Sequence, residues 1–103
     1  MDLILAVDIG TGGVRAGIYD EKLDNKIIEN VNYSTNYPAP GRAEQDPQEI
    51  LSAVIKVINQ AIDKSNFSGN DISYLTFDCS VHTILGLDKN FKPITPALTW
   101  EDS

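Results

Sequence analysis

The chain has 103 residues, and its 8 basic and 15 acidic side chains give it a formal net charge of −7. This length is that of one domain with a modest core, and a hydrophobic fraction of 42% argues against an intrinsically disordered chain. The charge disfavours binding to nucleic-acid phosphates, no run of about 20 apolar residues is present to span a membrane, and the single cysteine excludes an internal disulfide. We therefore expect a folded cytoplasmic protein that binds neither nucleic acid nor a membrane.

Three strands are predicted near the N-terminus. Leu3–Val7 is an uninterrupted apolar run, which is typical of a central strand covered on both faces. Val14–Tyr19 alternates with the two-residue period of a strand, and Ile27–Thr35 resumes an extended, β-branched pattern. We expect the three strands to form an antiparallel meander, with a glycine-rich turn between the first two.

The clearest signal in the middle of the chain is the start of a helix. Asp46 is an N-cap acid, Pro47 suits the first helical position, and Glu49 suits the third. Apolar residues then recur every three or four positions over Ile50–Ile62, which predicts an amphipathic helix packed on the sheet. We interpret the whole stretch Glu44–Pro47 as helix capping.

Two further extended segments follow this helix. Ile72–Phe77 predicts a fourth strand, and the helical crossover places it parallel to one of the first three. Thr83–Leu87 predicts a fifth extended piece, closed by the turn residues Asp88–Asn90. The pattern as a whole indicates an α/β protein with one main packing helix.

The segment between the first two strands has the composition of an anion site. Glycines let main-chain amides approach a phosphate closely, Thr11 adds a hydroxyl, and Arg15 adds a cation. Asp8 ends the first strand and suits a magnesium ion held through water. Neither a Walker loop nor a dinucleotide fingerprint is present. The alternative is a plain hairpin, whose turn needs glycine for positive φ and has Asp8 as a turn acid.

Several stretches of the sequence resemble a known family. Leu5–Thr11 with Arg15 resembles the first phosphate motif of the sugar kinase, Hsp70 and actin superfamily. The order of the further stretches resembles the N-terminal part of an FGGY carbohydrate kinase, and the resemblance covers essentially all of residues 1–103. These further stretches are Pro40–Pro47, Ser80–His82, Leu87–Pro93 and Pro96–Asp102.

The resemblance implies a ribonuclease-H-like half-domain with sheet order 3-2-1-4-5. It also implies transfer of the terminal phosphoryl group of ATP to a hydroxyl of a small-molecule sugar or sugar acid, with Asp8 linked to Mg²⁺. Most relatives have hydroxyl residues where this chain has Gly12 and Gly13, so we expect fewer side-chain contacts to phosphate. The residues implied to bind the nucleotide phosphates are Asp8, Gly10, Thr11, Gly12, Gly13 and Arg15.

The same resemblance implies a sugar site formed by Val81, His82, Trp100 and Asp102. An indole face packs on the C–H surface of a sugar, while imidazole and carboxylate hold its hydroxyls. The alternatives are a structural histidine, a core tryptophan and a solvated acid near the chain end. Cys79 lies near His82, but no acid or second base is arranged with it, so we reject a thiol nucleophile.

Residues 1–103 are interpreted as the incomplete first domain of such a kinase, since the family's general base and adenosine motif lie further downstream. We therefore expect the chain alone to be catalytically silent. Two alternatives come from other classes of protein. One is a ribonuclease-H-like nuclease with Asp8 as a metal ligand. The other is a non-catalytic, truncated kinase module, which would self-associate through the apolar surface of its severed sheet.

Overall fold

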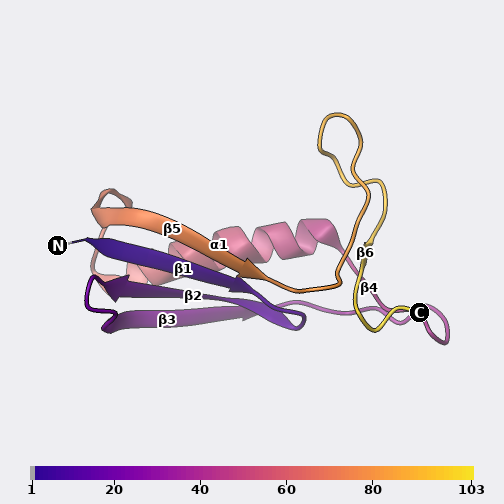
Figure 1. Ribbon diagram of the computed structural model, residues 1–103, viewed down its shortest axis with the longest axis horizontal. Helices are drawn as coiled ribbons and strands as arrows, with labels where there is room; N and C mark the ends of the chain where they lie inside the picture. The colour runs from indigo at the N-terminus through magenta and orange to yellow at the C-terminus, as the bar shows by residue number, and fades with distance from the viewer. Residues whose placement is uncertain (1) are drawn as a thin grey trace.

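A computed structural model describes residues 2–103 as a mixed sheet with one long helix on one face (Figure 1). A short two-stranded ribbon lies beyond one end of this sheet, which gives the chain an elongated shape of 49 × 28 × 20 Å. Within residues 2–103, no helix is both long and apolar enough to cross a membrane. The elements are β1 (Leu3–Ile9), β2 (Gly13–Asp20), β3 (Asn25–Asn32), β4 (Glu44–Gln45), α1 (Pro47–Ser65), a 3₁₀ helix (Gly69–Asp71), β5 (Ile72–Cys79) and β6 (Ala97–Leu98).

The main sheet has four strands in the order β3-β2-β1-β5. The first three strands form the predicted antiparallel meander, and β5 lies parallel to β1 after the crossover through α1. The register sets Asp8 of β1 opposite Arg15 of β2 on one side and Asp78 of β5 on the other. The four strands follow the expected order, and three charged side chains meet at one end of the sheet.

The expected fifth strand does not join this sheet. Ile84 pairs with Leu98, and Leu87 pairs with Pro93, each through an isolated antiparallel bridge. Residues 83–87 therefore fold back on the C-terminal segment, and no fifth strand extends the main sheet in the described chain. The Asp88 carboxylate closes the intervening turn, because it accepts hydrogen bonds from the amides at positions 90 and 92.

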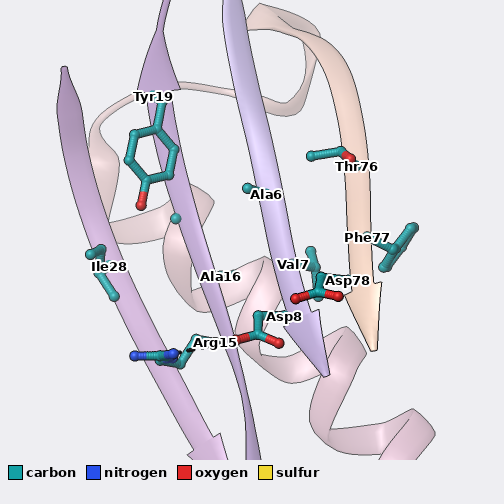
Figure 2. Close-up of a pocket in the computed structure, with 11 residues that line it drawn as sticks. Ala6, Val7, Asp8, Arg15, Ala16, Tyr19, Ile28, Thr76, Phe77 and Asp78 are labelled. Atoms are coloured by element: carbon teal, nitrogen blue, oxygen red, sulfur yellow. Dashed lines mark hydrogen bonds and ion pairs between the residues drawn. The ribbon is translucent and has the colours of Figure 1, made fainter. Parts of the chain in front are cut away.

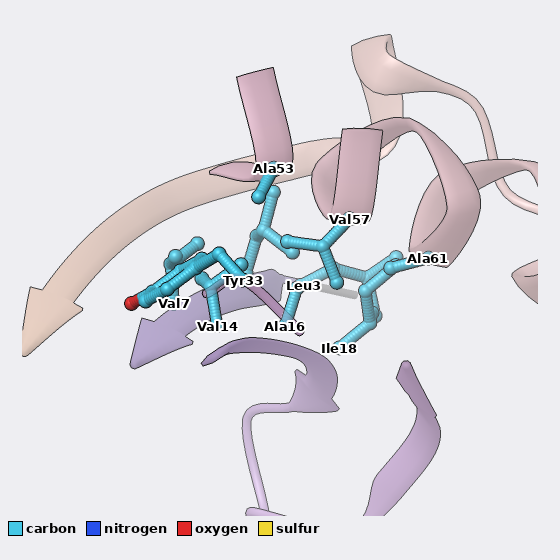
Figure 3. Close-up of a cluster of buried hydrophobic side chains, with 10 residues drawn as sticks. Leu3, Val7, Val14, Ala16, Ile18, Tyr33, Ala53, Val57 and Ala61 are labelled. Carbon is cyan, nitrogen blue, oxygen red and sulfur yellow. The ribbon is translucent and has the colours of Figure 1, made fainter. Parts of the chain in front are cut away.

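The two faces of the sheet carry different side chains. Figure 2 shows Asp8, Arg15 and Asp78 on the face turned away from α1. The opposite face carries the core, in which alternate residues of β1 and β2 meet α1 (Figure 3). The strands have a period of two, so this separation follows directly from the sequence pattern. The core residues are Leu3, Leu5, Val7, Val14, Ala16, Ile18, Tyr33, Ala53, Val57 and Ala61.

Helix α1 begins as predicted but uses fewer capping residues than expected. The Asp46 carboxylate accepts a hydrogen bond of 2.9 Å from the amide of Gln48, and Pro47 is the first helical residue. The Glu49 side chain does not hydrogen-bond to the N-cap residue, because its carboxylate accepts a hydrogen bond of 2.9 Å from the amide of Ser34. The capping interpretation is wrong for residues 44 and 45, which form strand β4. A long-range hydrogen bond and a strand pairing have replaced the local capping contacts.

Strand β5 is the least covered strand of the sheet. Helix α1 lies mainly over β2 and β3, so Leu75 and Phe77 of β5 stay about half exposed on the helix side. Leu51 and Ile55 of α1 are similarly exposed. The apolar surface on this side of the sheet is therefore larger than a closed core would leave.

The β2–β3 turn depends on the carboxylate of Asp20. It accepts hydrogen bonds from the amides of Asp24 at 3.0 Å and Lys22 at 2.9 Å, and the Lys26 ammonium lies 3.3 Å away. The Asp24 amide is the largest of the influences that hold the pKa of Asp20 below its usual value. Because the folded pKa is the lower one, the stabilisation is complete above the unfolded pKa and disappears as the pH falls through the folded pKa.

Replacing Asp20 by Asn is therefore expected to lower stability at neutral pH and to matter progressively less in acid. Urea unfolding at a series of pH values from 7 to 2 measures this, and the difference between Asp20→Asn and the unaltered chain should shrink below about pH 4. Asp24→Asn is the control, because only the main-chain groups of Asp24 contact Asp20. A difference that stays constant down to pH 2 would contradict the assigned role of the charge.

Candidate functional site

The glycine-rich turn lies where β1 ends, and the segment that follows β5 starts beside it. Parallel strands end at the same edge of a sheet, so β1 and β5 deliver their following loops to one place. The Ser80 hydroxyl donates a hydrogen bond of 3.1 Å to the carbonyl of Ile9. The predicted phosphate turn and the predicted sugar segment therefore adjoin each other.

Tyr33 contacts the turn from the core side. Its hydroxyl bonds to the carbonyls of Gly10 and Gly13, and its main-chain amide donates to the carbonyl of Gly12 at 3.2 Å. The amide of Gly10 closes the turn by donating to Gly13 at 2.8 Å. The sequence pattern predicts that Tyr33 continues the third strand, but β3 ends at Asn32 and Tyr33 turns into the core. Its role is missed because a strand pattern does not show where the chain leaves the sheet.

Gln45 supplies the remaining contact to the turn. Its side-chain amide donates to the carbonyl of Thr11 and to the hydroxyl of Thr35. Only 3% of Gln45 is exposed, which is unusual for a polar residue without such partners. In the sequence, Gln45 stands directly before the N-cap residue Asp46, so it is interpreted as part of the helix cap and its contact with the turn is missed.

The amides of Thr11 and Gly12 donate no hydrogen bond to any part of the described chain. A Cβ at Gly12 would have nothing within 4 Å, whereas a Cβ at Gly13 would lie 2.8 Å from the carbonyl oxygen of Val31. The turn does join an antiparallel pair, but none of its glycines has a positive φ, so the part of the hairpin alternative that requires positive φ is wrong. Gly13 is needed for the close approach of β3, while Gly12 leaves open space above two unpaired amides.

Charged groups flank this turn. Arg15 and Asp8 form an ion pair of 3.3 Å, with 69% and 44% of their side chains exposed. With Asp78 they line a cavity of about 320 Å³ on the open face of the sheet (Figure 2). Asp78 was not predicted, although an acid near the end of a strand parallel to β1 is a recognisable signal. The ion pair is exposed enough for a ligand to exchange with either partner.

The residues present suit a hydrated magnesium ion better than a fully coordinated metal. In residues 2–103, no group of three or more His, Cys, Asp or Glu side chains is placed to hold a metal. Mg²⁺ keeps several waters and is commonly bound by one or two carboxylates together with phosphate oxygens. Asp8 beside an open turn meets that requirement, since its carboxylate is accessible.

Three of the predicted sugar residues, Val81, His82 and Trp100, are exposed, whereas Asp102 is partly buried. Val81 and His82 follow β5, and His82 has a left-handed φ of 64°. Trp100 is 62% exposed, so the alternative of a core tryptophan is wrong, and its contact with a sugar stays a prediction. The Ile84–Leu98 bridge brings His82 and Trp100 to the same end of one antiparallel pairing, because each lies two residues beyond it. The imidazole of His82 and the indole of Trp100 are thus carried by chain segments at the same end of this pairing.

Asp102 is tied to the loop that precedes β4. Its carboxylate accepts the amide of Ala43 at 2.9 Å and the guanidinium of Arg42 at 3.2 Å. The amide of Ala43 is the main cause of the lowered pKa of Asp102, and Arg42 adds to it. The solvated-acid alternative is therefore wrong, and a sugar contact from Asp102 stays a prediction. Exposed Cys79 has no hydrogen bond to a base within the described residues.

Fold and site together define a mixed α/β protein that presents unpaired amides and an accessible acid at one edge of its sheet. The sequence model of the FGGY family of carbohydrate kinases, N-terminal domain, matches residues 3–103. The chain therefore belongs to the FGGY family of carbohydrate kinases. This membership confirms the resemblance found in the sequence and decides against the nuclease alternative.

Individual relatives agree with this assignment. A gluconokinase from Bacillus subtilis is 34% identical over 104 residues, which are 97% of this chain and 19% of that protein. The crystal structure of a gluconate kinase from Lactobacillus acidophilus superposes with a TM-score of 0.89 at 26% identity, over 98% of this chain and 20% of that one. The crystal structure of Plasmodium falciparum glycerol kinase with ADP superposes with a TM-score of 0.86 at 25% identity, over 100% of this chain and 21% of that one. The chain spans about a fifth of the length of these relatives.

Proposed function

We propose that this chain provides the phosphate-binding edge of a kinase that transfers the terminal phosphoryl group of ATP to a hydroxyl of a sugar or sugar acid. The observation that carries the proposal is the pair of unpaired amides at Thr11 and Gly12, beside the accessible Asp8 and Arg15. The names of the relatives, gluconokinase and glycerol kinase, support an acceptor of the polyol or sugar-acid class.

Phosphoryl transfer of this kind depends on positioning and on neutralising charge. The amides of Thr11 and Gly12 bind phosphate oxygens, and the hydroxyl of Thr11 adds a donor. Arg15 exchanges its partner, leaving Asp8 for a phosphate oxygen, because the ion pair is largely exposed. Asp8 is the residue that would hold a hydrated Mg²⁺ ion, and that ion would supply neutralisation of the phosphate charge.

The proposed sugar site combines the segment after β5, which begins beside the turn, with residues of the C-terminal segment. Trp100 offers an indole face to the C–H surface of the acceptor, and His82 hydrogen-bonds its hydroxyls. Val81 adjoins His82 in the chain and Asp102 lies two residues after Trp100, and both are included in the proposed sugar site. The general base is proposed to come from outside residues 1–103, so the chain alone is expected to bind nucleotide without turning it over.

Gly12→Leu tests the phosphate site without disturbing the fold. Nothing lies within 4 Å of a Cβ at Gly12, so stability should not change, but a leucine side chain fills the space above the amides. We expect MgATP affinity to fall about tenfold or more, since each hydrogen bond to a charged group contributes about 1.5–3 kcal/mol. The measurement is a titration followed by the ¹H–¹⁵N signals of the amides at positions 11 and 12.

Gly12→Ser is the matched control, because its small hydroxyl side chain can join the phosphate contacts instead of blocking them. It should bind MgATP at least as tightly as the unaltered chain. If Gly12→Leu bound MgATP unchanged, or if the signals of residues 11 and 12 did not respond to MgATP in the unaltered chain, the phosphate site would be assigned wrongly.

A further inference from the structure

We infer that Tyr33 and Gln45 are positioning residues that aim the free amides of the turn at phosphate. The inference rests on the proposed function and deepens it, because it names side chains that touch neither nucleotide nor sugar. Both residues lie outside the turn in sequence, at the end of β3 and in β4. Neither belongs to the residues predicted to bind a ligand.

The planarity of the peptide bond couples the direction of each amide to that of the preceding carbonyl. In a trans peptide, the carbonyl of one residue and the amide of the next point in opposite directions. A contact that holds the Gly10 carbonyl towards the core therefore turns the Thr11 amide outward. A contact that holds the Thr11 carbonyl does the same for the Gly12 amide. The direction of each free amide is thus set by the partner of the preceding carbonyl.

Tyr33 is such a partner for the first of these carbonyls. Its hydroxyl bonds to Gly10 and Gly13, and its main-chain amide bonds to Gly12. Its side chain belongs to the core and Tyr33 is only 8% exposed, so the ring has little freedom to move. Burial, with a smaller effect of the Asp8 charge, raises the pKa of Tyr33, which keeps the hydroxyl protonated as a donor.

Gln45 is the partner for the second carbonyl. Its backbone is fixed by pairing with Ala97 of β6, and both protons of its side-chain amide have acceptors, at Thr11 and at Thr35. Thr11 is otherwise held only by its neighbours in the turn. Removing the Gln45 donor would leave the Thr11 peptide free to rotate, and the Gly12 amide would no longer be preset for an anion.

Preset donors bind more tightly than donors that must be ordered on binding, because no conformational freedom is lost at that step. Tyr33→Phe and Gln45→Met keep the shape of the side chains but remove their donors to the turn. Each is expected to weaken binding of magnesium tripolyphosphate about fivefold, the factor associated with one net hydrogen bond. Tyr74→Phe and Gln48→Met are the matched controls, since both residues are exposed and bond to no part of the turn.

The probe is magnesium tripolyphosphate, titrated into ¹⁵N-labelled chain, with the dissociation constant read from the Thr11 and Gly12 amides. The signals of α1 verify that each variant is folded. If one of Tyr33→Phe and Gln45→Met does not fold, the binding constant of the other tests the inference. Weaker binding in a folded variant, with both controls unchanged, supports the inference. Equal binding in folded variants overturns it and leaves the proposed function standing. No response of Thr11 and Gly12 in the unaltered chain overturns both.

Discussion

Replacing Ile18 by Ala is expected to lower the free energy of unfolding by about 2–5 kcal/mol, the cost of removing a large buried aliphatic side chain. Ile18 lies in β2 and is fully buried, in one cluster with Val57 and Ala61 of α1. These two helix residues are small or β-branched, so the helix has little side-chain volume with which to fill the cavity. Domains of this size have about 5–15 kcal/mol in total, so the loss is a large part of the stability.

Urea unfolding followed by circular dichroism measures the change. Ile94→Ala is the matched control, because Ile94 is 66% exposed and its truncation should change stability by no more than about 0.5 kcal/mol. Equal effects of the two variants would show that the interface between β2 and α1 does not hold the fold together.

The sequence predicts the elements of the main sheet well because their signals are local. Alternation in β2, an apolar run in β1 and a capped apolar period in α1 each identify an element without knowledge of the rest. Even the parallel placement of β5 follows from a general rule of chain crossovers. Residues 83–98 are harder to predict, because the pairing of Ile84 with Leu98 is non-local and involves too few residues to leave a pattern.

The candidate site is predictable in its turn but not in the residues that support the turn. Glycine composition identifies residues 10–13, whereas the direction of their carbonyls depends on where Tyr33 and Gln45 arrive after folding. Gln45 has a competing local explanation as a capping residue, and tertiary packing overrides it. For Trp100 the structure decides against the core alternative, because this large aromatic side chain is largely exposed.

Asp8→Asn is expected to remove most of the effect of magnesium on nucleotide binding. In the unaltered chain, the carboxylates of Asp8 and Asp78 lie on neighbouring strands at the same register and repel a free triphosphate. Asp8 would hold a hydrated magnesium ion that offsets this repulsion, because the ion's positive charge would compensate the charges of the carboxylate and the phosphates. Asparagine keeps the volume and hydrogen-bonding capacity of the side chain but carries no charge to hold the ion.

Two opposite changes follow from this substitution. Binding of ATP in EDTA should strengthen, because one negative charge beside the turn is gone, and binding of MgATP should weaken. The dissociation constant for ATP divided by that for MgATP should therefore fall about tenfold, which corresponds to about 1.4 kcal/mol. Asp63→Asn is the control, since Asp63 is an exposed acid on α1 with the same formal charge and no contact with the turn. An unchanged ratio in Asp8→Asn, measured by calorimetry with and without magnesium, would mean that the ion is held elsewhere and that Asp8 serves only to orient Arg15.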